Sequence, residues 1–107
     1  MKHDFQLAYT ISPLDTGKPQ HVASAEKART ILRHNLGWET TGDIETTLLG
    51  QVELAPATLD DKAREAKRQV RMRIKGELES ADVIKHIEFE GSLMVNGLGS
   101  AITLNIP

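Results

Sequence analysis

The sequence lacks cysteine altogether and contains no long apolar run. Without cysteine there is no disulfide framework, no thiolate zinc site and no cysteine nucleophile. No apolar segment is long enough to span a bilayer. Residues 1–4 lead directly into a strand pattern, without the apolar core of a signal peptide. We therefore expect a cytoplasmic protein that has no membrane association.

The sequence also lacks the short motifs of common catalytic and cofactor sites. It has no nucleophile elbow, no paired-histidine motif on a helix and no phosphate-binding glycine loop. His3, His21 and His34 lie near the ends of predicted elements, where histidine usually serves at the surface or as a cap. We expect a protein that is not an enzyme, with no cofactor and no small-molecule substrate.

One group of residues suggests a metal site and has a simpler explanation. His86, Glu88 and Glu90 alternate along the third predicted strand and would share its outer face. A histidine and two carboxylates can hold a divalent metal. Alternate residues on a straight strand are about 6.8 Å apart, however, which is too wide for three direct ligands. We interpret them as a polar face that opposes aggregation, and we expect no metal.

The length and composition indicate one folded domain covering residues 1–107. Apolar residues make up 39% of the chain and charged residues 26%, which is ordinary for a globular protein. A chain of this length buries roughly two-thirds of its unfolded surface, enough for one core. No repeat, low-complexity tract or linker divides the chain.

The first third of the chain predicts a strand followed by a helix. Apolar and polar residues alternate over residues 5–11, the pattern of a half-buried strand. Ser24 is the expected N-cap of a helix that runs to Leu36. Gly37 is expected to adopt the left-handed conformation that closes this helix. The helical residues expected to face inward are Ala25, Ala28, Leu32 and Leu36.

The middle of the chain predicts a second strand over residues 44–54 and a helix over residues 58–79. The strand should direct Ile44, Thr46, Leu48, Gly50, Val52 and Leu54 to one face and Gln51 and Glu53 to the other. Thr58 and Asp61 form a short capping box. The helix ends near Gly76 or at Ser80. Its apolar face is expected to contain Leu59, Ala63, Ala66, Val70, Ile74 and Leu78.

A hairpin is expected at the end of the chain. Asn96-Gly97 is a preferred dipeptide for a two-residue type I′ turn, because both positions need positive φ. A turn there places all large apolar residues of both strands on one face, and a shift by one residue would separate them. The expected pairs are Val95 with Leu98, Gly91 with Ile102, Phe89 with Leu104 and Ile87 with Ile106.

The resulting order, β-α-β-α-β-β, predicts an α+β fold. We expect a two-layer sandwich in which a four-stranded mixed sheet carries two helices on one face and is solvated on the other. This order of elements is similar to the C-terminal domain of translation initiation factor three and to the Alba chromatin proteins, which bind nucleic acid. The resemblance rests on topology, and it implies a nucleic-acid-binding fold.

The helix over residues 58–79 carries a line of basic side chains, which we call the basic stripe: Arg64, Arg68, Arg71 and Lys75. Their spacing of four, three and four places them along one helix face, with Lys67 beside them. Residues 58–75 have a net charge of +4, whereas the remainder has −6. Such a stripe could follow the phosphates of a nucleic acid.

Local ion pairs offer another explanation for most of the basic stripe. The pairs Asp60–Arg64, Glu65–Arg68 and Lys75–Glu79 are at helical spacing. Cations near the end of a helix also suit its dipole. Arg71 has no acidic neighbour on its own helix, so we expect it to meet an anion from elsewhere in the fold or from a partner.

The surface features favour binding over catalysis. Trp38, the single tryptophan, follows the first helix and is either a lid on the core or an exposed interface anchor. The leading hypothesis is a small interaction module that acts through contacts with a partner protein or with itself, a homodimer included, and whose segregated charge steers the partner. The alternative is nucleic-acid binding through the basic helix 58–79.

Overall fold

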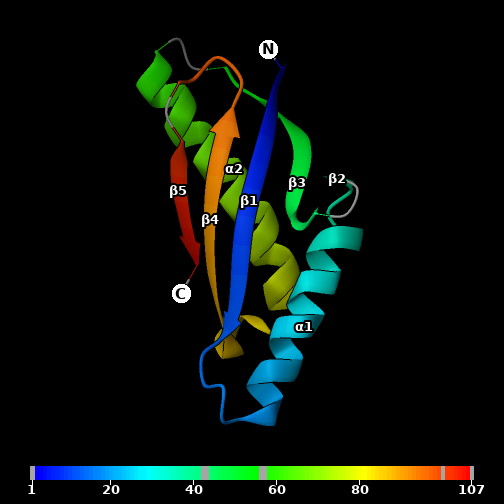
Figure 1. The fold of residues 1–107 in the computed structure, drawn as a ribbon. Coiled ribbons are helices and arrows are strands. Elements are labelled where there is room, and N and C mark those ends of the chain that lie inside the picture. The colour runs from blue at the N-terminus through cyan, green and yellow to red at the C-terminus, as the bar shows by residue number, and fades with distance from the viewer. Residues whose placement is uncertain (1, 42–43, 56–57, 100, 107) are drawn as a thin grey trace.

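The computed structural model describes residues 2–41, 44–55, 58–99 and 101–106, which form an α+β domain (Figure 1). The side chains of residues 41–46 are not described. The predicted inward orientation of Ile44 and Thr46 therefore lies outside the described part of the chain. In chain order the elements are β1 (Lys2–Pro13), α1 (Pro19–His34), β2 (Glu39–Thr41), β3 (Ile44–Glu53), α2 (Leu59–Ser80), the short 3-10 helix η1 (Ile84–His86), β4 (Ile87–Val95) and β5 (Ile102–Ile106).

The described residues form a sheet of five strands in the order β2-β3-β1-β4-β5, and each neighbouring pair is antiparallel. The predicted four-stranded mixed sheet is therefore wrong, although the α+β class is confirmed. The difference arises from β2, whose three residues are too few to show alternation. Because β2 and β3 form a hairpin, the chain reverses before β3 and meets β1 antiparallel. The order that carried the resemblance to the nucleic-acid-binding families is not the order of this chain.

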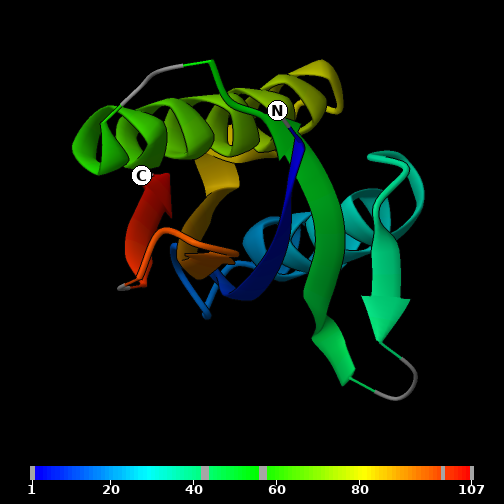
Figure 2. The ribbon, with the colours of Figure 1, turned by 90° about the horizontal axis from the view of Figure 1, so that it is seen from above.

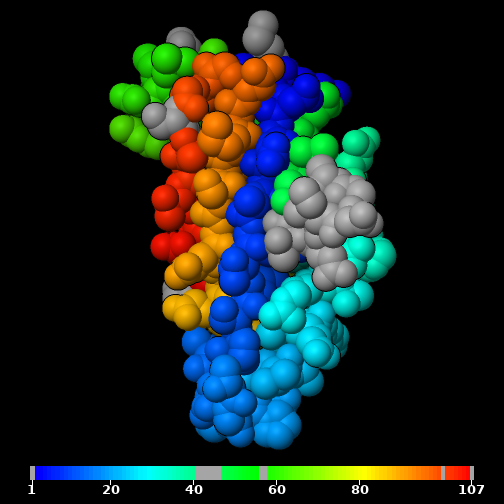
Figure 3. Space-filling view, in the orientation of Figure 1, coloured from blue at the N-terminus to red at the C-terminus, as the bar shows by residue number. Residues whose placement is uncertain are grey.

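The core lies between the sheet and the two helices, which cover one face (Figure 2). The alternating residues of β1 predicted to face inward, Phe5, Leu7, Tyr9 and Ile11, are all buried. In the second predicted strand Leu48, Val52 and Leu54 are buried, whereas Gln51 and Glu53 are exposed. The polar residues between the buried positions of β1 and β4 lie on the open face, which Figure 3 shows.

The N-cap of helix α1 lies six residues before the predicted N-cap, Ser24. Pro19 occupies the first turn, and the N-cap Lys18 makes no side-chain capping hydrogen bond. Proline is well suited to this place because its fixed φ fits the helix and its missing N–H would be unpaired there. Ser24 is thus an interior helical residue. The helix ends at His34 with Asn35 as C-cap, before the predicted end at Leu36. Gly37 has the expected positive φ of 74°, but it lies past the C-cap and does not close the helix as predicted.

Helix α2 begins and packs largely as predicted. The Thr58 hydroxyl accepts the Asp61 backbone N–H at 3.2 Å, and the helix continues through Gly76 to Ser80. Its buried residues are Ala66, Val70, Ile74 and Leu78. The prediction for Leu59 is wrong, since 60% of this residue is exposed.

The hairpin of β4 and β5 exists, but its register differs by two residues from the predicted one. Phe89 lies opposite Ile106 and Gly91 opposite Leu104. The Leu98 N–H still donates to the Val95 carbonyl at 3.1 Å. Gly97 has a φ of 86°, whereas Asn96 does not have positive φ, the pattern of a type II rather than a type I′ turn. A two-residue shift keeps every side chain on its face, so hydrophobic alternation could not detect it.

Candidate interaction surface

The two ends of the basic stripe are occupied by local ion pairs. Arg64 contacts Asp61 at 3.4 Å, rather than the predicted Asp60, and 80% of its side chain is exposed. Lys75 lies 3.8 Å from Glu79, as predicted. Exposed pairs at this helical spacing contribute only about 0.3–0.5 kcal/mol each, so they orient the side chains without holding them firmly.

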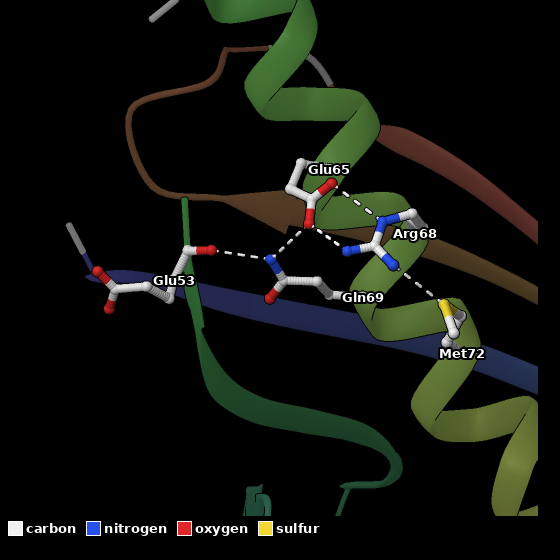
Figure 4. A network of polar contacts seen from close by, with 5 residues as sticks. All are labelled: Glu53, Glu65, Arg68, Gln69 and Met72. Carbon is white, nitrogen blue, oxygen red and sulfur yellow. Dashed lines mark hydrogen bonds and ion pairs between the residues drawn. The ribbon is translucent and has the colours of Figure 1, made fainter. Parts of the chain in front are cut away.

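Arg68 belongs to a network on the side of α2 that faces β3 (Figure 4). Its Nε donates to Glu65 at 3.0 Å, as the predicted pair requires, and another nitrogen contacts the sulfur of Met72 at 3.2 Å. Gln69 connects this network to the sheet by donating to the Glu65 carboxylate at 3.0 Å and to the Glu53 backbone carbonyl at 2.8 Å. Hydrogen bonds from Arg68 and then Gln69 lower the pKa of Glu65 to about 2.

This lowered pKa predicts an acid-sensitive contribution to stability. The pKa of Glu65 is below its ordinary value of 4.5, so the contribution is present above pH 4.5 and is lost as pH falls toward 2. Glu65→Gln should lower the melting temperature at pH 6, and the difference from the original chain should vanish near pH 2. Thermal unfolding followed by circular dichroism at several pH values measures this. A difference that is constant with pH would contradict it.

Arg71 is the one member of the basic stripe that reaches the sheet. Its Nε donates to the backbone carbonyl of Asn105 on β5 at 3.3 Å. The partner expected from elsewhere in the fold is therefore a neutral carbonyl and not an acid. At 3.3 Å this hydrogen bond is long, and a carboxylate would be a stronger acceptor for the guanidinium. Lys67, one turn earlier, is exposed and makes no ion pair with the described part of the chain.

The first turns of α2 extend past β5, which is the last strand of the sheet order (Figure 2). In Figure 3 these turns are visible beyond the edge of the sheet as the green projection. The first fully buried residue of the helix is Ala66, whereas Ala63 is half-buried and Leu59 is mostly exposed. The apolar face of α2 is thus longer than the sheet beneath it.

Trp38 lies at the opposite edge of the sheet and is partly buried. Its ring meets Phe5 edge to face, with centroids 5.0 Å apart. The Arg73 guanidinium lies 5.7 Å from the ring centroid of Trp38 and donates to the Leu36 carbonyl at 2.7 Å. The tryptophan thus packs against the core and keeps part of its surface in solvent, and its role as an interface anchor stays a prediction.

The structure separates the residues considered for a metal site. His86 is the last residue of η1 and not part of β4, so the assignment to one strand is wrong. Its ring stacks on His21 at 4.6 Å and its Nδ1 lies 3.2 Å from the Ser24 hydroxyl. Glu88 and Glu90 are exposed on the open face of β4. Sequence reasoning missed this histidine pair because it depends on the earlier start of α1.

No protein-family model, no curated protein and no solved structure matches the chain. Within the described residues, neither helix combines the length and the apolar character needed to cross a membrane.

Proposed function

We propose that the chain is a small, non-catalytic interaction module of the cytoplasm that binds an extended, acidic segment of a partner protein as an added strand beside β5. The observation that carries the proposal is the edge of β5 under the protruding start of α2, where Arg71 already contacts the strand backbone. Backbone pairing at a sheet edge gives affinity, and alternate side chains of the added strand give specificity.

The backbone of β5 offers hydrogen-bonding groups to such a segment. The Asn105 carbonyl faces the free edge, since Arg71 on α2 reaches it there. Backbone groups of alternate residues in a strand point to the same side, so those of Thr103 share this edge. An added strand would replace Arg71 at Asn105, and the freed guanidinium would bind an acidic side chain of the partner.

The protruding start of α2 supplies the other side of the site. An added strand would lie beneath Leu59 and Ala63, and its inward side chains would cover that exposed apolar surface. Lys67 and Arg71 would meet acidic residues of the same segment. These charges disfavour a second copy of β5 at this place, because two basic helices would then face each other.

The alternative, nucleic-acid binding through residues 58–79, has weaker support. A protein surface that binds the backbone of a nucleic acid needs several cations in a line that can each bind a phosphate. All four members of the basic stripe have partners within the chain: Asp61 for Arg64, Glu65 for Arg68, the Asn105 carbonyl for Arg71 and Glu79 for Lys75.

The test measures binding of a blocked heptapeptide of alternating glutamate and valine by NMR and calorimetry. The peptide should slow hydrogen exchange at the amides of Thr103 and Asn105. Arg71→Glu should weaken binding by about tenfold or more, because it places a carboxylate against the acidic peptide. Lys27→Glu, the same charge change at an exposed position of α1, should leave the affinity unchanged.

Two results would contradict the proposal. One is equal affinity for the matching peptide of lysine and valine. The other is peptide binding that leaves the amides of β5 unprotected. A DNA or RNA affinity that falls steeply with salt and is lost in Arg71→Glu would favour the nucleic-acid alternative in its place.

A further inference from the structure

A groove of about 580 Å³ lies at the edge of the sheet opposite β5. Strand β2 pairs with β3 only as far as Glu39, which lies opposite Leu49, whereas β3 continues to Glu53. The chain before Glu39 turns away through Gly37, which has positive φ. The groove thus occupies the place that a longer β2 would fill, beside Gly50 and Gln51.

Two aromatic rings form the inner part of the groove. Phe5 is buried, and Trp38 meets it edge to face, so the two rings hold each other in position. Arg73 fixes Trp38 further from the side of α2. Gly50 leaves room for this arrangement, since a Cβ atom there would lie only 2.7 Å from Phe5 and 2.8 Å from Trp38. The aromatic surface is therefore built into the fold.

Two carboxylates line the same groove. Asp4 and Glu39 are both exposed, and they approach it from β1 and β2. The Gln51 amide donates to the Asp4 carboxylate at 2.9 Å and so holds it in place. Carboxylates bind guanidinium and ammonium groups with charge-assisted hydrogen bonds. Asp4 lies opposite Gln51 and Glu39 opposite Leu49, so both carboxylates are on the open face, whereas the two aromatic rings are on the helix side of the groove.

We infer that this groove binds an extended segment of a partner protein that carries arginine or lysine. The backbone of the segment lies along the uncovered part of β3 at Gly50 and Gln51. Its cationic side chain lies on the open face beside the carboxylates of Asp4 and Glu39, and the next side chain along the segment lies on the helix side beside Trp38. This site is separate from the edge of β5 and has the opposite charge preference, so the two edges select different segments.

The single tryptophan of the sequence makes the test direct, because Trp38 lies in the groove. A blocked pentapeptide of alternating arginine and valine should cause a saturable change in tryptophan emission. The double substitution Asp4→Asn with Glu39→Gln should weaken binding by about tenfold or more. Glu26→Gln on the exposed side of α1 is the matched control and should bind normally. Arg71→Glu should also bind normally, which separates this site from the one at β5.

The inference would be overturned by an emission change that does not saturate, or by equal binding of a glutamate–valine pentapeptide. Unchanged affinity in the double variant would overturn it as well. An emission shift that depends on protein concentration without any peptide would assign the groove to a second copy of the chain instead.

Discussion

Phe89→Ala should lower the free energy of unfolding by about 3–5 kcal/mol, the usual cost of removing a large aromatic ring from a core. Phe89 is fully buried on β4 and stacks on Tyr9 of the central strand, with ring centroids 5.6 Å apart. A domain of this size has a total stability of about 5–15 kcal/mol, so the variant is expected to lie close to unfolding at room temperature. Urea denaturation followed by circular dichroism gives the value.

Met94→Ala on the same strand is the matched control for this experiment. Met94 lies on the open face of the sheet, where 48% of it is exposed. Its truncation should change stability by less than about 0.5 kcal/mol. If Phe89→Ala costs less than about 1 kcal/mol, or if both variants cost the same, the position of the core on one face of the sheet is wrong.

Gly50→Ala should destabilise the chain by about 1–3 kcal/mol, although it adds a single methyl group. The new Cβ atom would lie 2.7 Å from the Phe5 ring and 2.8 Å from Trp38. Phe5 is buried and packed, so relief of the clash has to move Trp38 or the strand itself. Urea denaturation gives the loss of stability, and Trp38 emission should shift to longer wavelength as the ring becomes more exposed.

Gly76→Ala should have the opposite sign. Gly76 is an exposed residue inside α2, and an added Cβ atom would have no neighbour within 4 Å. Alanine in a helix interior is more favourable than glycine by about 0.5–1 kcal/mol, so this variant should be more stable than the original chain. Equal effects of the two glycine substitutions would show that the groove at Gly50 is not closely packed.

The parts of the fold with strong local signals could be predicted from the sequence. Strict alternation in β1 and the capping pair Thr58 and Asp61 are properties of neighbouring residues, and both are confirmed. β2 could not be recognised, because three residues show no period. The predicted start of α1 is wrong because Ser24 resembles a cap, whereas Pro19 begins the helix by its backbone geometry.

Only part of the candidate sites could be predicted from the sequence. The spacing of basic residues indicated that Arg71 lacks a partner on its own helix, and the structure provides the Asn105 carbonyl across the fold. The groove could not be predicted, because Asp4, Trp38 and Gly50 come together only when β3 pairs with β1 on one side and with β2 on the other. Long-range strand pairing of this kind produces no recognisable pattern among neighbouring residues in the sequence.

The central position of β1 also determines how the chain must fold in time. Leu7 lies between Leu48 on β3 and Leu93 on β4, so β1 acquires its second neighbour only after all the residues up to β4 have been synthesised. For such distant pairings, long loops must close and lose conformational entropy before the new contacts stabilise the chain, which slows folding. Until β3 and β4 have paired with β1, the apolar side of β1 stays uncovered. Pairing of β1 with another molecule during this time would lead to aggregation.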